Sequence, residues 1–235
     1  MSRRFGLAAF IVLCLGLLSL SGVAAQDSTP DASTPTTSAE PVSLSAWSVG
    51  DPAMPTPEQC TTAPASTDDV AASLLALESR TELPLTSNGV VALAASGPAD
   101  QAAVDGVVAT LTEFWACTNA GNRASLVALM TPNGIADLYD LDLAADETEL
   151  RAAVGAALTP GDPRAEGGMA GIDGILSVVA LEDGRIAALV MNSDPEIVGG
   201  DQVTDLFIFI EAEGQYLIDA FASDPFGMVD DYGIE

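Results

Sequence analysis

The spacing of apolar residues changes once along this chain, and that change limits the folds open to it. From residue 100 to Leu158 apolar residues recur every three or four positions, the period of an amphipathic helix. From Gly174 to Ser223 they recur at every second position, the period of a half-buried strand. Helices followed by an antiparallel run of strands are typical of an α+β fold, with the helices against the sheet.

Three helices are predicted before the strands, each preceded by a side chain that can cap it. The caps are Asp100, Asn122 and Asp146. The helices are predicted over residues 100–120, 122–132 and 146–158. A short helix over residues 68–79 precedes them, and residues 135–143 are compatible with either a short strand or a turn of helix.

Four strands are predicted after a Gly- and Pro-rich loop, over residues 174–181, 186–193, 204–212 and 215–223. The pairs Asp183-Gly184 and Glu213-Gly214 are hairpin signals, so neighbouring strands should be antiparallel. The expected fold class is α+β. Three N-terminal helices pack on a curved antiparallel sheet of about four strands, behind a disordered N-terminal stalk.

The N-terminus has the pattern of a Sec-type signal peptide. Arg3 and Arg4 precede an apolar run over residues 5–20, and small residues end at Ala25, before Gln26. The alternative is a transmembrane anchor, but the run is short for a span of about 20 residues and no basic flank follows it. We therefore expect a secreted or extracytoplasmic protein of the cell envelope, with no membrane span after cleavage.

After the signal peptide, amino-acid composition separates a low-complexity segment from the segments expected to fold. The segment that follows the signal is rich in Ser, Thr, Pro and Ala, and it has too little apolar surface to offset the entropy of ordering. The expected organisation is a signal peptide at 1–25, a disordered linker at 26–67, a helical extension at 68–99, the α+β domain at 100–223 and an acidic tail at 224–235.

The charge of the chain restricts its partners. Seven basic residues stand against 34 acidic ones, for a formal net charge of −27. A field of that sign repels phosphate backbones and anionic lipid surfaces, so nucleic acid is excluded as a partner. A small apolar ligand and a second copy of the chain stay open as partners.

Cysteine and histidine content limits the chemistry. Cys14 leaves with the signal peptide, so Cys60 and Cys117 are expected to form a disulfide in an oxidising compartment. The chain has no histidine, and two thiolates are too few to hold zinc. A Ser-His-Asp triad is likewise excluded. We expect no metal and no cofactor.

Three residues are the candidates for acid–base catalysis. By strand alternation Asp219 shares a face with Leu217 and Phe221, where a buried carboxyl would have a raised pKa and could act as a base. Tyr139 and Tyr216 could then donate hydrogen bonds to a developing oxyanion. The alternative, which we favour, is that Asp219 lies at the sheet rim or pairs with an arginine such as Arg185.

Aromatic residues are the candidates for a ligand pocket, although aromatics at helix and strand spacing more often form plain core. The pocket candidates are Phe114, Trp115, Phe207 and Phe209. A separate acidic stretch, residues 137–149, could bind a hard cation, but it lacks the glycine and ligand spacing of a calcium loop. A solvated acidic loop is the favoured interpretation of that stretch.

Two segments carry a resemblance to a known family. Residues 113–132, EFWACTNAGNRASLVALMTP, resemble the first helix, the break and the second helix of the nuclear transport factor 2-like superfamily, also called SnoaL-like or cystatin-like. The segments DGRIAALVMNSDP and DLFIFIEAEGQYLIDAF resemble its last strands. The resemblance covers residues 100–223 and implies a cone-shaped domain whose sheet wraps a pocket, used for small apolar ligands or for dimerisation.

The family also includes ketosteroid isomerases and scytalone dehydratases, but their His-dependent chemistry has no counterpart in a chain without histidine. The leading hypothesis is therefore an exported, non-catalytic domain that binds a small apolar ligand or a protein partner. One alternative is an isomerase, dehydratase or cyclase that uses a pocket Asp and Tyr. A second is a structural or dimeric envelope module whose pocket is filled by its own side chains.

Overall fold

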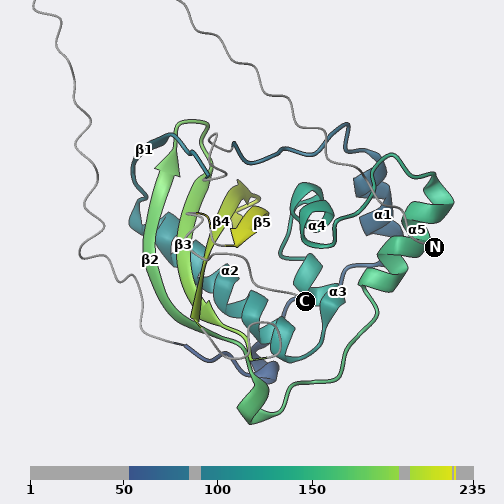
Figure 1. Ribbon diagram of the computed structural model, residues 1–235, viewed down its shortest axis with the longest axis horizontal. Coiled ribbons are helices and arrows are strands. Elements are labelled where there is room, and N and C mark those ends of the chain that lie inside the picture. Colours follow the sequence, from purple (N-terminus) through teal and green to yellow (C-terminus); the bar gives the residue numbers. More distant parts are fainter. Residues whose placement is uncertain (1–52, 85–90, 196–201, 224, 226–235) are drawn as a thin grey trace, which may run out of the picture. The chain divides into compact units, whose positions relative to one another are not determined.

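The computed structural model describes residues 53–84, 91–195, 202–223 and 225, all within the compact unit Ser43–Glu235. The fold is α+β, as the change in apolar spacing predicts (Figure 1). Five strands form one antiparallel sheet in the order β1-β2-β3-β4-β5. They are β1 (Ala95–Pro98), β2 (Gly171–Leu181), β3 (Ile186–Ser193), β4 (Gln202–Ala212) and β5 (Gln215–Ser223).

Five α-helices accompany this sheet in the described part of the chain, and each begins after a residue whose side chain accepts a backbone N–H. The predicted caps Asp100, Asn122 and Asp146 are confirmed. The helices are α1 (Thr67–Leu75), α2 (Gln101–Asn119), α3 (Arg123–Val127), α4 (Pro132–Leu138) and α5 (Glu147–Ala157). Two 3-10 turns, η1 (Pro57–Gln59) and η2 (Glu166–Gly168), complete the elements.

Of the stretch that the sequence left open between strand and helix, residues 135–138 are helical and residues 139–143 are not. Thr131 caps α4 by accepting the N–H of Gly134, and Pro132 occupies the first position of the helix. Proline was expected to end the preceding helix; instead it begins a new one, because its missing N–H is not needed in the first turn. Helix α3 already ends at Val127.

The four predicted strands are confirmed with small changes in their bounds, and the tight turns between them lie where expected. Gly184 has φ of 87°, and Glu213 and Gly214 have φ of 53° and 80°, so both hairpins use the left-handed conformations that such turns require. The sheet has one strand more than expected. Strand β1 is four residues long and reads ASGP, without the β-branched residues that indicate a strand.

The sheet is covered on both faces. On one face the side chains of β2 to β5 share a hydrophobic core with residues from all five helices, and α2 and α4 contact the strands. Figure 1 shows α2 running across this face. On the other face a smaller cluster of strand residues packs against Leu83, Val91 and Leu93, which come from the predicted extension. The extension at 68–99 therefore belongs to the same body as residues 100–223, since it supplies helix α1, strand β1 and part of the second core.

Part of the predicted disordered linker is ordered. Ala53 forms an antiparallel bridge with Ile172, and buried Asn119 donates a hydrogen bond of 2.7 Å to the carbonyl oxygen of Pro55. Thr61 donates its N–H and its hydroxyl to Glu113 at 2.9 Å. The prediction of disorder is therefore wrong for residues 53–67, because tertiary contacts replace the apolar surface that this segment lacks. The predicted signal peptide, linker residues 26–52 and tail residues 226–235 lie outside the described residues.

The predicted disulfide joins Cys60 to Cys117, with the two Cα atoms 4.7 Å apart. Cys117 is fully buried on α2, so the bond attaches the segment after η1 to the centre of the fold. Among the described helices, none is long and apolar enough to span a bilayer.

Candidate functional site

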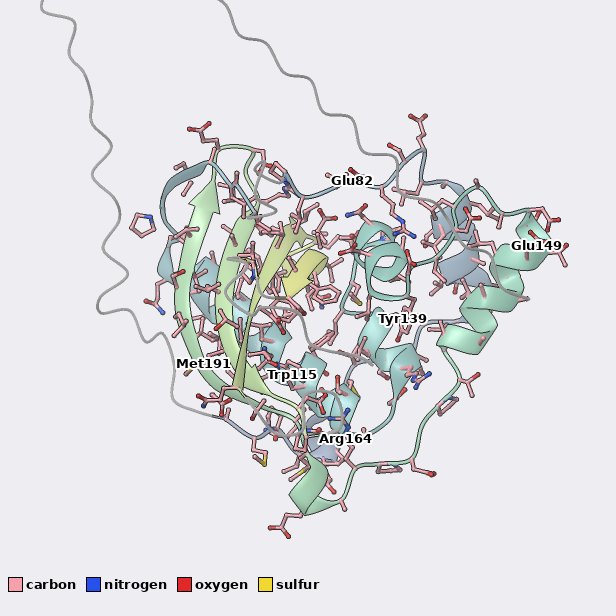
Figure 2. All side chains as sticks on the ribbon, in the orientation of Figure 1. Glu82, Trp115, Tyr139, Glu149, Arg164 and Met191 are labelled. Atoms are coloured by element: carbon pink, nitrogen blue, oxygen red, sulfur yellow. A yellow bond between two sulfur atoms is a disulfide. The ribbon has the colours of Figure 1, made fainter. Side chains whose placement is uncertain are left out.

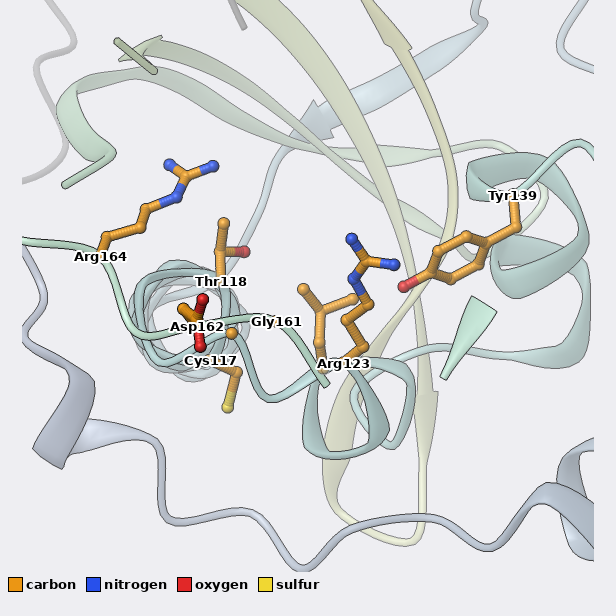
Figure 3. Close-up of a pocket in the computed structure, with 9 residues that line it drawn as sticks. Cys117, Thr118, Arg123, Tyr139, Gly161, Asp162 and Arg164 are labelled. Atoms are coloured by element: carbon orange, nitrogen blue, oxygen red, sulfur yellow. The ribbon is translucent and has the colours of Figure 1, made fainter. Parts of the chain in front are cut away.

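A pocket of about 390 Å³ lies beyond the C-terminal end of α2 (Figure 3). Three separate segments form it: the end of α2 with α3, the end of α4, and the loop before η2. Its lining residues are Cys117, Thr118, Gly121, Arg123, Leu126, Tyr139, Gly161, Asp162 and Arg164. The side chains thus include two guanidinium groups, a phenol and a carboxylate beside the apolar wall of Leu126.

The loop of the pocket is held against α2 by backbone contacts. Gly121 ends the α2–α3 turn with φ of 63°, and a Cβ there would lie 2.5 Å from the carbonyl oxygen of Gly161, so only glycine fits. Gly161 donates its N–H to the carbonyl of Gly121 at 2.9 Å, and Arg164 donates its N–H to that of Asn119 at 2.8 Å. The loop therefore has a defined position relative to α2.

The two arginines of the pocket have different surroundings. The guanidinium of Arg164 pairs with Asp194 at 2.8 Å, and both side chains are almost fully buried, at 10% and 4% exposed. Arg123 is exposed and makes no ion pair with any residue in the described ranges. Figure 3 shows its guanidinium and the Tyr139 phenol pointing toward one another. Burial raises the pKa of Tyr139, and the positive charge of Arg123 offsets part of that rise.

The carboxylate of Asp219, the candidate catalytic base, already has two side-chain partners. Its carboxylate accepts the hydroxyl of Thr131 at 2.7 Å and pairs with Arg185 at 3.3 Å. The alternative that the sequence left open, pairing with Arg185, is the arrangement that the structure has. Asn133 also donates to the carbonyl oxygen of Asp219 at 2.8 Å. This carboxylate connects α4, the β2–β3 hairpin and β5.

The alternation argument for Asp219 is wrong because β5 contains a bulge at this residue. Ile218 lies opposite Phe209 and Ala220 lies opposite Ile208, so Asp219 has no partner on β4. As a result Ile218 contacts the core on the helix side, whereas Ala220 contacts the core on the other face. Strict alternation would have placed both on one face.

The two candidate tyrosines do not converge on Asp219. Among the described residues no hydrogen bond joins either phenol to it. The ring of Tyr216 packs against Gly106 of α2, since a Cβ at Gly106 would lie 2.3 Å from it. Tyr139 lies at the end of α4 (Figure 2) and lines the pocket.

The four aromatics predicted to line a ligand pocket lie in the main hydrophobic core, at 0–7% exposure. Phe114 packs edge-on against Trp115 and Phe207, with ring centres 5.2 and 5.9 Å apart, and Phe207 stacks on Phe209 at 6.4 Å. None of them lines the pocket of Figure 3. This is the core arrangement that the sequence analysis weighed as the alternative.

A buried carboxyl that the sequence analysis missed is Asp205 on β4. It is 7% exposed, accepts a hydrogen bond of 2.8 Å from Asn192, and its other oxygen has no partner in the described part of the chain. Strand alternation places it on the same face as Phe207 and Phe209, toward the helices. The same alternation, followed along residues 204–212, places Asp205 among buried aromatic residues and could have identified it.

Asp205 should make stability fall as pH rises. Burial raises the pKa of Asp205, and hydrogen bonds from Asn192 and Ser223 offset part of the rise. A carboxyl whose pKa is higher folded than unfolded contributes fully below its unfolded value, about 3.8, and this contribution is lost as pH rises through the folded value. We expect Asp205→Asn to match the wild type near pH 3 and to be about 1–3 kcal/mol more stable near pH 8, measured by urea unfolding.

Asp183→Asn is the control for that experiment. Asp183 is half exposed, and hydrogen bonds from Arg185 lower its pKa. Asp183→Asn should therefore lower the stability near pH 8 and have little effect at low pH, the opposite of the effect expected for Asp205→Asn. Equal stability of Asp205→Asn and wild type at both pH values would contradict the role given to Asp205.

The acidic stretch has no metal-site geometry. In the ranges that the structure covers, no group of three or more His, Cys, Asp or Glu residues is placed to hold an ion. Its members have structural partners instead: Asp146 caps α5, Asp140 pairs with Arg80 at 3.3 Å, and Asp137 accepts the N–H of Phe221.

The fold and the pocket together define an α+β protein with an open antiparallel sheet and a polar pocket at one end of its central helix. Comparison with protein-family models, with curated proteins and with solved structures gives no match to this chain.

Proposed function

We propose that this protein is an extracytoplasmic, non-catalytic domain of the nuclear transport factor 2-like type that binds a small ligand with an apolar body. The observation that carries the proposal is the pocket at the end of α2, which is large enough for such a ligand and whose loop is hydrogen-bonded to the end of that helix. Leu126 and the ring of Tyr139 supply its apolar walls. Helices packed on one face of an antiparallel sheet are compatible with the cone-shaped fold of this superfamily.

Binding is favoured over catalysis by the state of the carboxyl groups. Asp219 is already paired with Arg185 and Thr131, so it is poorly placed to accept a proton from a substrate. In the pocket itself, the carboxylate of Asp162 is exposed. A non-catalytic role needs only shape and a few fixed polar groups.

Native mass spectrometry of the mature protein purified from its source tests the proposal. We expect a protein ion with the added mass of a retained ligand. Gly161→Phe should lose this mass, because the new ring occupies a position that lines the pocket, where a Cβ meets only the Cα of Gly121 at 3.8 Å.

Gly167→Phe is the matched control, since a Cβ at Gly167 meets nothing within 4 Å and the residue lies outside the pocket. It should retain the ligand. A wild-type protein without added mass, or equal retention by both variants, would argue against binding in this pocket.

A further inference from the structure

We propose that the pocket recognises an anionic group on its ligand, a carboxylate in the first instance, through Arg123 and Tyr139. The inference rests on the proposed binding function and names the chemical class that the site selects. It starts from an imbalance in how the arginines of the fold are used.

Five arginines lie in the described part of the chain, and the other four are all paired with carboxylates. Arg80, Arg151, Arg164 and Arg185 each have a carboxylate oxygen within 3.3 Å. The whole chain holds 34 acidic residues, so carboxylates are plentiful. The guanidinium of Arg123 nevertheless forms no ion pair or hydrogen bond with any described residue, and the side chain lines the pocket.

The phenol of Tyr139 likewise lacks a hydrogen-bond partner among the described residues. No described residue hydrogen-bonds to its hydroxyl, although the ring is half-buried at the end of α4. Figure 3 shows the phenol and the guanidinium of Arg123 pointing toward one another in the pocket. A guanidinium has only donors and a phenol donates one O–H, so the pair is complementary to an acceptor with negative charge.

The other charged groups of the pocket do not cancel this preference. Arg164 is neutralised by Asp194, at 2.8 Å. Asp162 is exposed on the loop before η2 and carries the opposite charge. An anionic group is therefore directed to the end of the pocket formed by Arg123 and Tyr139, with the apolar body of the ligand against Leu126.

A comparison of benzoate with benzamide tests the inference, since the two have the same shape and differ in charge. Binding of each to the mature protein is measured by isothermal titration calorimetry and by amide chemical shifts of residues 118–126. We expect benzoate to bind about tenfold more tightly than benzamide, since hydrogen bonds to a charged group exceed neutral ones by about a factor of ten in affinity. Added salt should weaken benzoate only.

Three variants test whether Arg123 and Tyr139 cause the preference for benzoate. Arg123→Gln should lower the affinity for benzoate by about tenfold and leave the affinity for benzamide unchanged. Tyr139→Phe should lower the affinity for benzoate by a smaller factor. Arg151→Gln is the matched control: it removes the same charge from α5, where Arg151 pairs with Glu147 at 3.0 Å, away from the pocket lining. It should bind benzoate like the wild type. Thermal unfolding of each variant checks that the exposed Arg123 can be replaced without loss of the fold.

The outcomes separate the inference from the function on which it rests. Equal affinity for benzoate and benzamide, with both lost in Gly161→Phe, would overturn the anion preference and leave the binding pocket standing. Equal weakening of benzoate by Arg123→Gln and Arg151→Gln would overturn it as well, since general charge would then explain the effect. Failure of both probes to bind the wild type also overturns it; if the protein from its source carries no ligand either, the binding function falls with it.

Discussion

Replacement of both Cys60 and Cys117 by alanine is expected to lower the free energy of unfolding by about 4 kcal/mol and Tm by about 10 °C. The disulfide joins residues 57 positions apart, and the bond restricts the unfolded chain by closing that loop. In the folded protein it holds the segment after η1 against buried α2. Urea and thermal unfolding of the protein measure both quantities.

Two further variants distinguish the effect of the disulfide from the effect of the neighbouring hydrogen bond. Cys60→Ala alone should lower the free energy of unfolding by nearly as much as the double variant, because the remaining thiol of Cys117 has no partner with which to form a disulfide. Thr61→Ala removes the neighbouring hydrogen bond from its hydroxyl to Glu113 but keeps the disulfide, so it should cost about 1 kcal/mol or less. A double variant within about 1 kcal/mol of the wild type would contradict the stabilising role of the bond.

Replacement of Phe209 by alanine is expected to cost about 3–5 kcal/mol, because a fully buried aromatic ring is removed from a packed core. Phe209 has no exposed surface and stacks on Phe207 with ring centres 6.4 Å apart. Phe209→Leu preserves more of the volume and should cost about 1.5 kcal/mol or less. Urea unfolding gives the values, and an unchanged slope against urea shows that the transition stays two-state.

This prediction also decides between the two interpretations of the aromatic residues. Leu75→Ala is the control, because Leu75 is 43% exposed on α1, and it should stay within about 0.5 kcal/mol of the wild type. If Phe209→Ala were equally mild but the protein lost its retained ligand, the ring would line a binding cavity, as the family resemblance implies. A large loss of stability with ligand still retained identifies Phe209 as core.

The helix caps and the hairpin turns follow from the sequence because they depend on local chemistry. Asp100 and Asp146 cap helices through their own side chains, and Glu213-Gly214 forms a hairpin turn through its own φ values. Strand β1 could not be found in this way. Its four residues have no strand propensity of their own, and they are ordered by backbone pairing with β2.

The candidate site was less accessible to sequence reasoning, for two physical reasons. The bulge at Asp219 moves every later side chain of β5 to the opposite face, and a bulge leaves no pattern that periodicity can detect. The pocket joins Arg123, Tyr139 and the loop at Gly161, which are far apart along the chain. Only tertiary packing brings them together, through contacts such as the hydrogen bond from Gly161 to Gly121.

The sequence by itself determined the α+β class, the helix caps, the hairpins and the Cys60–Cys117 bond, because each depends on nearby residues or on the small number of cysteines. The tertiary structure alone decided that residues 53–67 are ordered, that Asp219 is an ion-pair partner, and that Arg123 has no such partner among the described residues. Each of these depends on which distant surface a side chain meets. That choice is made by packing in three dimensions and not by spacing along the chain.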